Sequence, residues 1–330
     1  MSHCDDGLDL RRKLGHRYPI ALSLNTFGLI ETRNGQPERA RFRCEQALGI
    51  FRDLEQPRGI GLACNALAEA LRRMTNVADL LTDEQSLKNL ELAEQYAKEA
   101  VGIFTDRVKE PMRLAEAYIE LGCVYRETAR RMKSDKARMA DLVTKGRDAF
   151  ESAVTSAGVE FAYRGVDALV NLAWMYYYIN DFDEAQKVVD TVFDMIDDRY
   201  LYTKERPPLG TEGLIPWFWV QLGKTYLLLG KSAFSKYEQA IQQDNVDEVR
   251  KQLNVVGYNW TLSVAYNEKY GKDFRDILGG RKMIYKYLGP LNPDEMGWVL
   301  DGVYSAYNSY YNEVALKTFE TSVNEHFGLF

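Results

Sequence analysis

The chain has 330 residues, of which 46% are hydrophobic and 27% are charged, and its formal net charge is −6. This composition excludes a disordered tail, a collagen-like rod and a disulfide-stapled miniprotein. The acidic balance gives no general attraction for nucleic acid, and the longest apolar stretch, 214–229, is interrupted by Pro216, Gln221 and Lys224, so it is too short for a membrane span. We expect neither nucleic-acid nor membrane partners.

Cysteines and histidines are few and scattered. No C-x-x-C occurs, and the first residues are charged from the fifth onward without an apolar core, so neither a zinc or disulfide framework nor a secretion signal is expected. We predict buried free thiols in a cytoplasmic protein without metal or cofactor. The residues concerned are Cys4, Cys44, Cys64 and Cys123, with His3, His16 and His326.

The N-terminal third of the chain contains recurring stretches. The heptapeptide ALGIFRD at 47–53 reappears as AVGIFTD at 100–106, and GLDLRRKL at 7–14 runs parallel to 47–54. Repeats at such offsets are typical of solenoids. By this alignment, residues 1–18 correspond to the second helix of a hairpin whose first helix is absent, and the repeats proper occupy 19–290.

A second, shorter pattern also recurs, which we call the signature. It consists of a large residue, any two residues, an apolar residue followed by Gly or Ala, any two residues, and another large residue. Each copy is followed by a segment with small residues at spacings of 3 and 4, which places them on one helical face. Together they predict helical hairpins. The copies are Leu24/Phe27-Gly28/Glu31, Cys64/Leu67-Ala68/Leu71, Tyr118/Leu121-Gly122/Tyr125, Leu169/Leu172-Ala173/Tyr176 and Trp219/Leu222-Gly223/Tyr226, with a weaker one at Thr261/Val264-Ala265/Glu268. The segments that follow the first five carry Ala40/Cys44/Ala47, Ala93/Ala97/Ala100, Gly146/Phe150/Ala153, Ala185/Val189/Val192 and Ala233/Tyr237/Ala240.

The pattern W-x2-L-G-x2-Y followed by A-x3-F-x2-A resembles the tetratricopeptide repeat (TPR), and the residues from Trp219 to Tyr226 fit its first half completely. The resemblance implies an all-α fold, a right-handed α–α superhelix of about six TPR-like hairpins. Two hairpins depart from the family spacing, which predicts longer helices or inserted connections around 75–86 and 130–144. Such elongated hairpins resemble the sensor regions of bacterial signal-transduction ATPases with numerous domains (STAND) and of maltose-regulator-like proteins.

The C-terminal segment 291–330 has no repeat match. Pro293, Asp294 and Glu295 predict a helix start, because proline fits the first turn and acids favour the positive end of the helix dipole. We expect a single capping helix here, so that residues 1–330 form one solenoid.

The resemblance also implies a binding face, since the first helix of each TPR hairpin lines the concave surface and asparagines there hold the backbone of an extended peptide. Three asparagines occupy such positions, and four arginines lie at the ends of the same helices. An equally weighted alternative is that these side chains are solvated or hydrogen-bond between helices. The residues are Asn25, Asn65 and Asn171, with Arg33, Arg72, Arg73 and Arg126.

Aromatic residues concentrate in the C-terminal half, which is also the more acidic half. Packing between hairpins is the favoured role for any single one of them, but aromatics with polar tips suit interfaces, so as a group they indicate a contact surface. Basic runs at 11–13, 39–43 and 130–133 are interleaved with or flanked by acids, and we interpret them as solvated helix faces. The groove-facing aromatic positions are Trp174, Tyr177, Tyr178, Trp217 and Tyr266.

No motif brings together catalytic side chains, so we do not expect an enzyme. The leading hypothesis is a non-catalytic sensor module that binds a protein or peptide on its concave face within a larger signalling or defence protein. The alternative is an architectural scaffold that self-associates, or docks another domain of the same polypeptide, through the aromatic C-terminal half.

Overall fold

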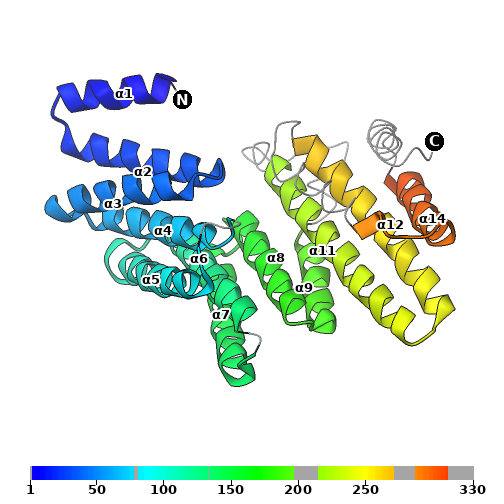
Figure 1. The fold of residues 1–330 in the computed structure, drawn as a ribbon. Coiled ribbons are helices and arrows are strands. Elements are labelled where there is room, and N and C mark those ends of the chain that lie inside the picture. Colours follow the sequence, from blue (N-terminus) through cyan, green and yellow to red (C-terminus); the bar gives the residue numbers. More distant parts are fainter. Residues whose placement is uncertain (1, 78–80, 133, 197–214, 271–286, 311–330) are drawn as a thin grey trace. The chain divides into compact units, whose positions relative to one another are not determined.

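The computed structural model describes residues 2–77, 81–132, 134–196, 215–270 and 287–310. Within these ranges it contains twelve α-helices, one short π-helix and no strand (Figure 1), which confirms the predicted all-α repeat class. None of the helices in this part of the chain is long and apolar enough to cross a membrane. The chain divides into two compact units, 1–179 and 180–330, each described by itself below. The prediction of one solenoid over the whole chain stays a prediction.

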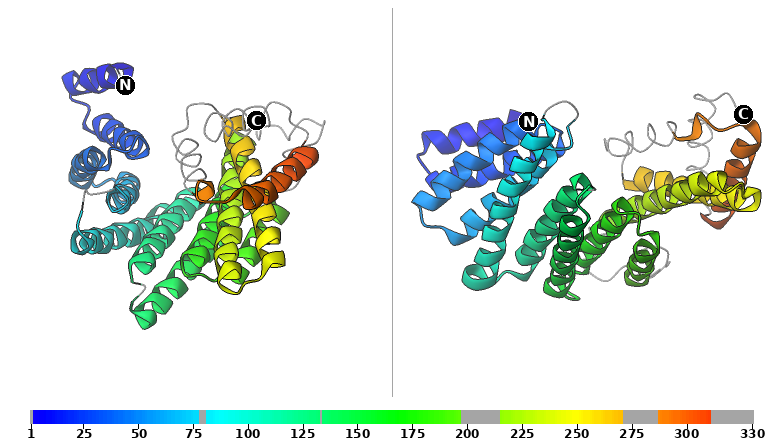
Figure 2. Two further views of the ribbon diagram at one scale, coloured as in Figure 1. Left: turned by 45° about the vertical axis from the view of Figure 1, so that its right-hand side comes forward. Right: turned by 60° about the horizontal axis from the view of Figure 1, so that its bottom comes forward.

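Unit 1 consists of antiparallel helices that follow one another along the chain (Figure 2). Prolines occupy the first turn of α3, α4 and α6, where the missing backbone N–H leaves no hydrogen bond unmade. The elements are α1 Ser2–Lys13, α2 Arg17–Arg33, α3 Pro37–Asp53, α4 Pro57–Met74, α5 Asp83–Gly102, the π-helix η1 Ile103–Val108, α6 Pro111–Arg131, α7 Lys136–Ala157 and α8 Ala162–Tyr178.

The first helices of successive hairpins form one layer of unit 1. Helices α2 and α4, α4 and α6, and α6 and α8 contact one another, while α3, α5 and α7 each pack against the helices before and after them in the chain. We call the series α2, α4, α6 and α8 the first-helix layer. It is the layer in which the predicted groove residues of unit 1 lie.

Small residues of the signature let the two helices of a hairpin approach closely. A Cβ on Gly28 would lie 2.2 Å from the Cys44 sulfur on the partner helix, and one on Gly122 would lie 2.6 Å from the Phe150 ring. Both distances are shorter than any tolerable contact, so the side chain is excluded at these positions. The glycines of the signature are therefore explained by the close packing of the two helices.

The two elongated hairpins reach their length in different ways. Helices α6 and α7 have 21 and 22 residues and are joined by only 132–135, so this hairpin is elongated by its helices. Between α4 and α5 the connection itself is longer, at 75–82, of which 78–80 lie outside the described residues. Thr82 begins α5 with a reciprocal capping box to Gln85.

Unit 2 corrects the prediction of the fifth hairpin. Its described elements are α9 Phe182–Met195, α11 Ile215–Gln242, α12 Val246–Tyr270 and α14 Pro293–Tyr310. The signature at 219–226 and the small residues at 233–240 lie on the single 28-residue helix α11. Nothing between them breaks the helix, and Gly230 serves for packing, because its Cβ would lie 2.2 Å from the Trp260 ring. The hairpin is formed instead by α11 and α12.

The expected start of the capping helix is confirmed. Asn292 accepts a hydrogen bond from the Glu295 backbone N–H at 2.9 Å, and the Glu295 carboxylate accepts one from the Asn292 backbone N–H at 2.9 Å. This reciprocal arrangement satisfies two backbone donors at the helix start. Helix α14 packs on α12, and the predicted remainder of the capping helix, after residue 310, lies outside the described residues. So does 271–286, which falls in the weak sixth repeat.

Three of the predicted free thiols are free and buried, namely those of Cys44, Cys64 and Cys123. Burial raises the pKa of Cys44 to about 12 and raises those of Cys64 and Cys123. We expect that, in a variant with Cys4 replaced by Ser, none of the three reacts with a thiol reagent until urea unfolds unit 1, because the thiolate is the reactive form. Rapid stoichiometric labelling of the native protein would contradict this arrangement.

Candidate functional site

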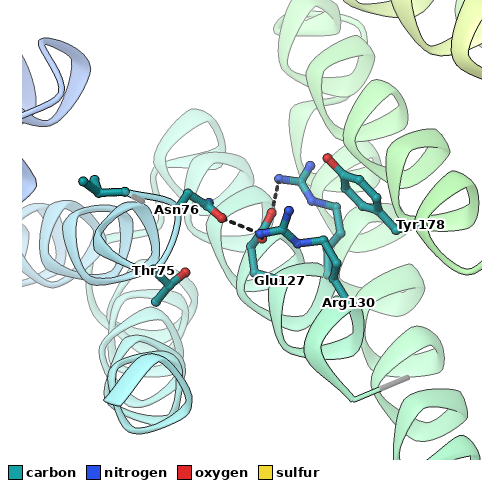
Figure 3. A pocket seen from close by; sticks show the side chains of 7 residues that line it. Thr75, Asn76, Glu127, Arg130 and Tyr178 are labelled. Carbon is teal, nitrogen blue, oxygen red and sulfur yellow. Dashed lines mark hydrogen bonds and ion pairs between the residues drawn. The ribbon is translucent and has the colours of Figure 1, made fainter. Parts of the chain in front are cut away.

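An open hollow of about 470 Å³ lies on unit 1 where α4, α6 and α8 end (Figure 3). Its walls come from three consecutive members of the first-helix layer: the residues just after α4, the last two turns of α6 and the last residue of α8. We call it the arginine hollow. It is lined by Thr75, Asn76, Val77, Arg126, Glu127, Arg130 and Tyr178.

One carboxylate holds three guanidinium groups beside the hollow. The Glu127 side chain, 4% exposed, accepts contacts from Arg126 at 3.2 Å, Arg130 at 2.9 Å and Arg131 at 3.3 Å. The last two lie three and four residues further along α6, the spacing that brings helix side chains together. Burial alone would raise the pKa of Glu127, but the surrounding arginine charges outweigh burial and lower it, so Glu127 stays ionised.

The most exposed of these three arginines is Arg130, which joins all three helix ends. It donates a hydrogen bond to the Asn76 side-chain oxygen at 2.5 Å, and its guanidinium lies 5.5 Å from the centre of the Tyr178 ring. In Figure 3 Arg130 lies between Glu127 and Tyr178, with Asn76 opposite. Arg131 donates in turn to the Thr75 carbonyl oxygen after α4. The helix ends are therefore fixed relative to one another.

Arg126 and Asn171, both predicted as groove residues, meet here. Arg126 donates to the Asn171 side-chain oxygen at 2.5 Å, and the Asn171 amide donates to the Asp167 carbonyl oxygen at 2.8 Å. Asn171 is thus already hydrogen-bonded within unit 1, as the interhelix alternative expected for it. The Nε atom of Arg126 is buried and has no hydrogen-bond partner.

Other predicted arginines lie elsewhere. Arg72 is buried and forms a two-pronged pair with Glu120, at 2.5 and 2.9 Å, between α4 and α6. Arg33 and Arg73 are exposed, and Arg73 donates to Glu69 on its own helix at 2.9 Å. Arg72 is therefore an interhelix contact and does not line the hollow.

The two remaining asparagines do not line the hollow. Asn25 is 6% exposed and Asn65 is partly buried, and the side-chain oxygen of each is buried without a hydrogen-bond partner. Their contact with a peptide stays a prediction.

The predicted aromatics divide between the two units. Trp174, Tyr177 and Tyr178 on α8 are partly buried and have ring centroids 5.6–5.7 Å apart, and the last of them lines the hollow. In unit 2, Trp217 is partly buried, whereas Tyr266 is only 3% exposed and stacks on Tyr226 at 5.5 Å. Tyr266 therefore packs inside unit 2.

Five residues that line the hollow are not among the residues predicted from the sequence, namely Thr75, Asn76, Val77, Glu127 and Arg130. The basic run at 130–133 was interpreted as a solvated face, but Arg130 and Arg131 are half-buried against the ends of neighbouring helices. The available signal was Glu127 at three and four positions before two arginines. That pattern is common on exposed helices, so only the burial of Glu127 distinguishes it.

No protein-family model matches the chain, and the comparison with curated proteins finds no match. Among solved structures, the chain is similar to one described as "Circular tandem repeat protein with novel repeat topology and enhanced subunit contact surfaces". The identity is 14%, the match covers 98% of this chain and 87% of that chain, and the TM-score is 0.35. We draw no conclusion about family or function from this similarity.

Proposed function

We propose that the protein is a non-catalytic binding module that holds a segment of a partner protein against the first-helix layer of unit 1, with the arginine hollow as its centre. The observation that carries this proposal is the hollow itself, in which an arginine and a tyrosine remain accessible at the meeting point of three helices. Arginine and tyrosine are the residue types enriched where binding energy concentrates. The resemblance to STAND sensor regions favours a sensor role within a larger signalling protein.

The shape and surroundings of the hollow support a chain segment as its occupant. The hollow is open, and the rings of Trp174 and Tyr177 continue from Tyr178 along α8. Solenoids present such extended surfaces to elongated ligands, because each repeat adds one helix to the same layer.

Among the described residues of unit 2, we find no specific support for the scaffold alternative. One aromatic cluster there is internal: Trp260 is 1% exposed, and Phe234 packs between it and Tyr237, with ring centroids 6.0 and 5.0 Å away. Such residues fill the core between α11, α12 and α14. They are therefore not offered to a second copy of the chain.

The test is a selection from a random-peptide display library, followed by measurement of the dissociation constant of a selected peptide. Arg130→Gln should weaken that peptide about tenfold, the usual effect of losing a charge-assisted contact. Arg138→Gln is the matched control, because the Arg138 side chain is exposed on α7 and its guanidinium makes only a long contact, 4.0 Å, with Glu91. Equal affinities for the two variants, across all selected peptides, would remove the arginine hollow from the function.

A further inference from the structure

We propose that the arginine hollow binds a phosphate monoester, and that its occupant is a phosphorylated serine or threonine side chain on the partner segment. This inference rests on the proposed function and adds the chemistry of the ligand.

The first argument is charge. Three guanidinium groups share the single carboxylate of Glu127, so this cluster, of which Arg126, Arg130 and Glu127 line the hollow, has a net charge of +2. A phosphate monoester carries about −1.5 to −2 at neutral pH, so it matches this excess, whereas a single carboxylate neutralises half of it. The nearby Arg72 does not alter the balance, because Glu120 already pairs with it.

The second argument is the incomplete hydrogen bonding of Arg126. Its side chain is 12% exposed; the guanidinium donates to Asn171 and lies 3.2 Å from a carboxylate that two other arginines also contact, but its buried Nε has no partner. A buried cation is costly unless it is paired. An anion in the hollow would supply the missing negative charge.

The third argument is the availability of donors. The Arg130 side chain is 34% exposed, and its polar contacts with Asn76 and Glu127 both use the same terminal nitrogen, Nη2. The other nitrogens of this planar group can approach two phosphate oxygens together, a geometry in which arginine is favoured. Arg131 adds to the positive field, and burial, followed by the charge of Arg130, lowers its pKa.

Glu127 does not block the site. It lines the hollow, but its side chain is only 4% exposed and its carboxylate is already contacted by three guanidinium groups. An anion in the hollow would therefore face the outer edges of the arginines, and Glu127 would keep them in position.

The first experiment uses inorganic phosphate as the probe, titrated calorimetrically at constant ionic strength with chloride as the reference anion. Wild type and Arg138→Gln should bind phosphate equally, Arg130→Gln should bind it about tenfold more weakly, and Arg130→Lys should fall between them. Melting curves recorded beside each titration establish that the variants fold. Equal phosphate binding by Arg130→Gln and Arg138→Gln, or no phosphate binding by wild type, would overturn the proposal.

The second experiment separates the sources of the phosphate group. Its probes are an alanine-based peptide with one phosphoserine and the same peptide with serine or glutamate. The phosphoserine peptide should bind at least as tightly as inorganic phosphate, with the same dependence on Arg130, and the other two should bind about tenfold or more weakly. A glutamate peptide of equal affinity, or phosphate bound while the phosphopeptide is rejected, would overturn the proposal.

The two proposals can fail separately. If library peptides depend on Arg130 but neither phosphate nor the phosphoserine peptide binds, the binding function stands and the phosphate inference is wrong. If phosphate and the phosphoserine peptide bind through other residues and no library peptide depends on Arg130, the function assigned to this hollow fails as well.

Discussion

Replacing Glu120 with Gln should lower the free energy of unfolding of unit 1 by about 3–5 kcal/mol, the cost of leaving one partner of a buried ion pair uncompensated. Glu120 and Arg72 are 9% and 10% exposed and are joined by two hydrogen bonds. Gln keeps the shape of Glu, so the loss is mainly electrostatic. Burial raises the pKa of Glu120 even beside Arg72, which shows that the carboxylate is costly to bury.

Urea denaturation followed by circular dichroism measures this effect, and the Arg52–Glu99 pair provides the control. That pair is also joined by two hydrogen bonds, both donated by Nη2 of Arg52 at 2.9 Å, but its side chains are 50% and 37% exposed. Glu99→Gln should therefore cost less than about 1 kcal/mol. A double variant, Arg72→Met with Glu120→Leu, should recover much of the loss of Glu120→Gln. Equal costs for Glu120→Gln and Glu99→Gln would contradict the burial of the first pair.

Replacing Gly302 with Ala should destabilise unit 2 by about 2–3 kcal/mol, toward the upper end for overpacking. A Cβ on Gly302 of α14 would lie 1.9 Å from the Asn254 carbonyl oxygen of α12, and one on Gly257 would lie 1.9 Å from the Val299 carbonyl oxygen. Backbone cannot move aside as a flexible side chain can, so the two helices would have to separate. That separation would open the packing around Val256 and Val299, both 2% exposed or less.

Gly297 on the same helix is the matched control, because a Cβ there meets nothing within 4 Å. Gly297→Ala should stabilise the protein by about 0.5–1 kcal/mol, since alanine is the better helix former. Thermal unfolding of the two variants gives opposite signs if α12 and α14 pack as described. A Gly302→Ala variant as stable as Gly297→Ala would mean that these backbones are not in contact.

The hairpins of unit 1 could be predicted from sequence because the residues that recur at helical spacing are also the residues at which the two helices of a hairpin touch. Gly28 and Cys44, or Gly122 and Phe150, occupy signature positions and meet in space. In unit 2 the same signature predicted a hairpin wrongly, because it shows which positions carry small residues but does not show where the chain turns. The spacing from Gly223 to Ala233 fits an uninterrupted helix as well as a hairpin. The structure has the uninterrupted helix, in which Gly230 packs on Trp260 of α12.

The site was less predictable, since it depends on helix ends that are far apart in sequence. Arg126, Asn171 and Tyr178 were proposed singly from their repeat positions, and the first-helix layer brings them together. Asn76 follows the end of α4 and meets Arg130, 54 residues later. No local pattern links two such residues, because the register of α4 against α6 is set by the whole interface.

The most direct measurement of the central claim is hydrogen exchange of the chain with and without a peptide selected from the random library. If the arginine hollow is the binding centre, bound peptide should slow exchange after the end of α4, at the ends of α6 and α8, and little elsewhere, because terminal turns open most readily in the free protein. The amides concerned lie at 75–77, 126–132 and 171–179. Protection confined to α3, α5 and α7, or to unit 2, would contradict the claim.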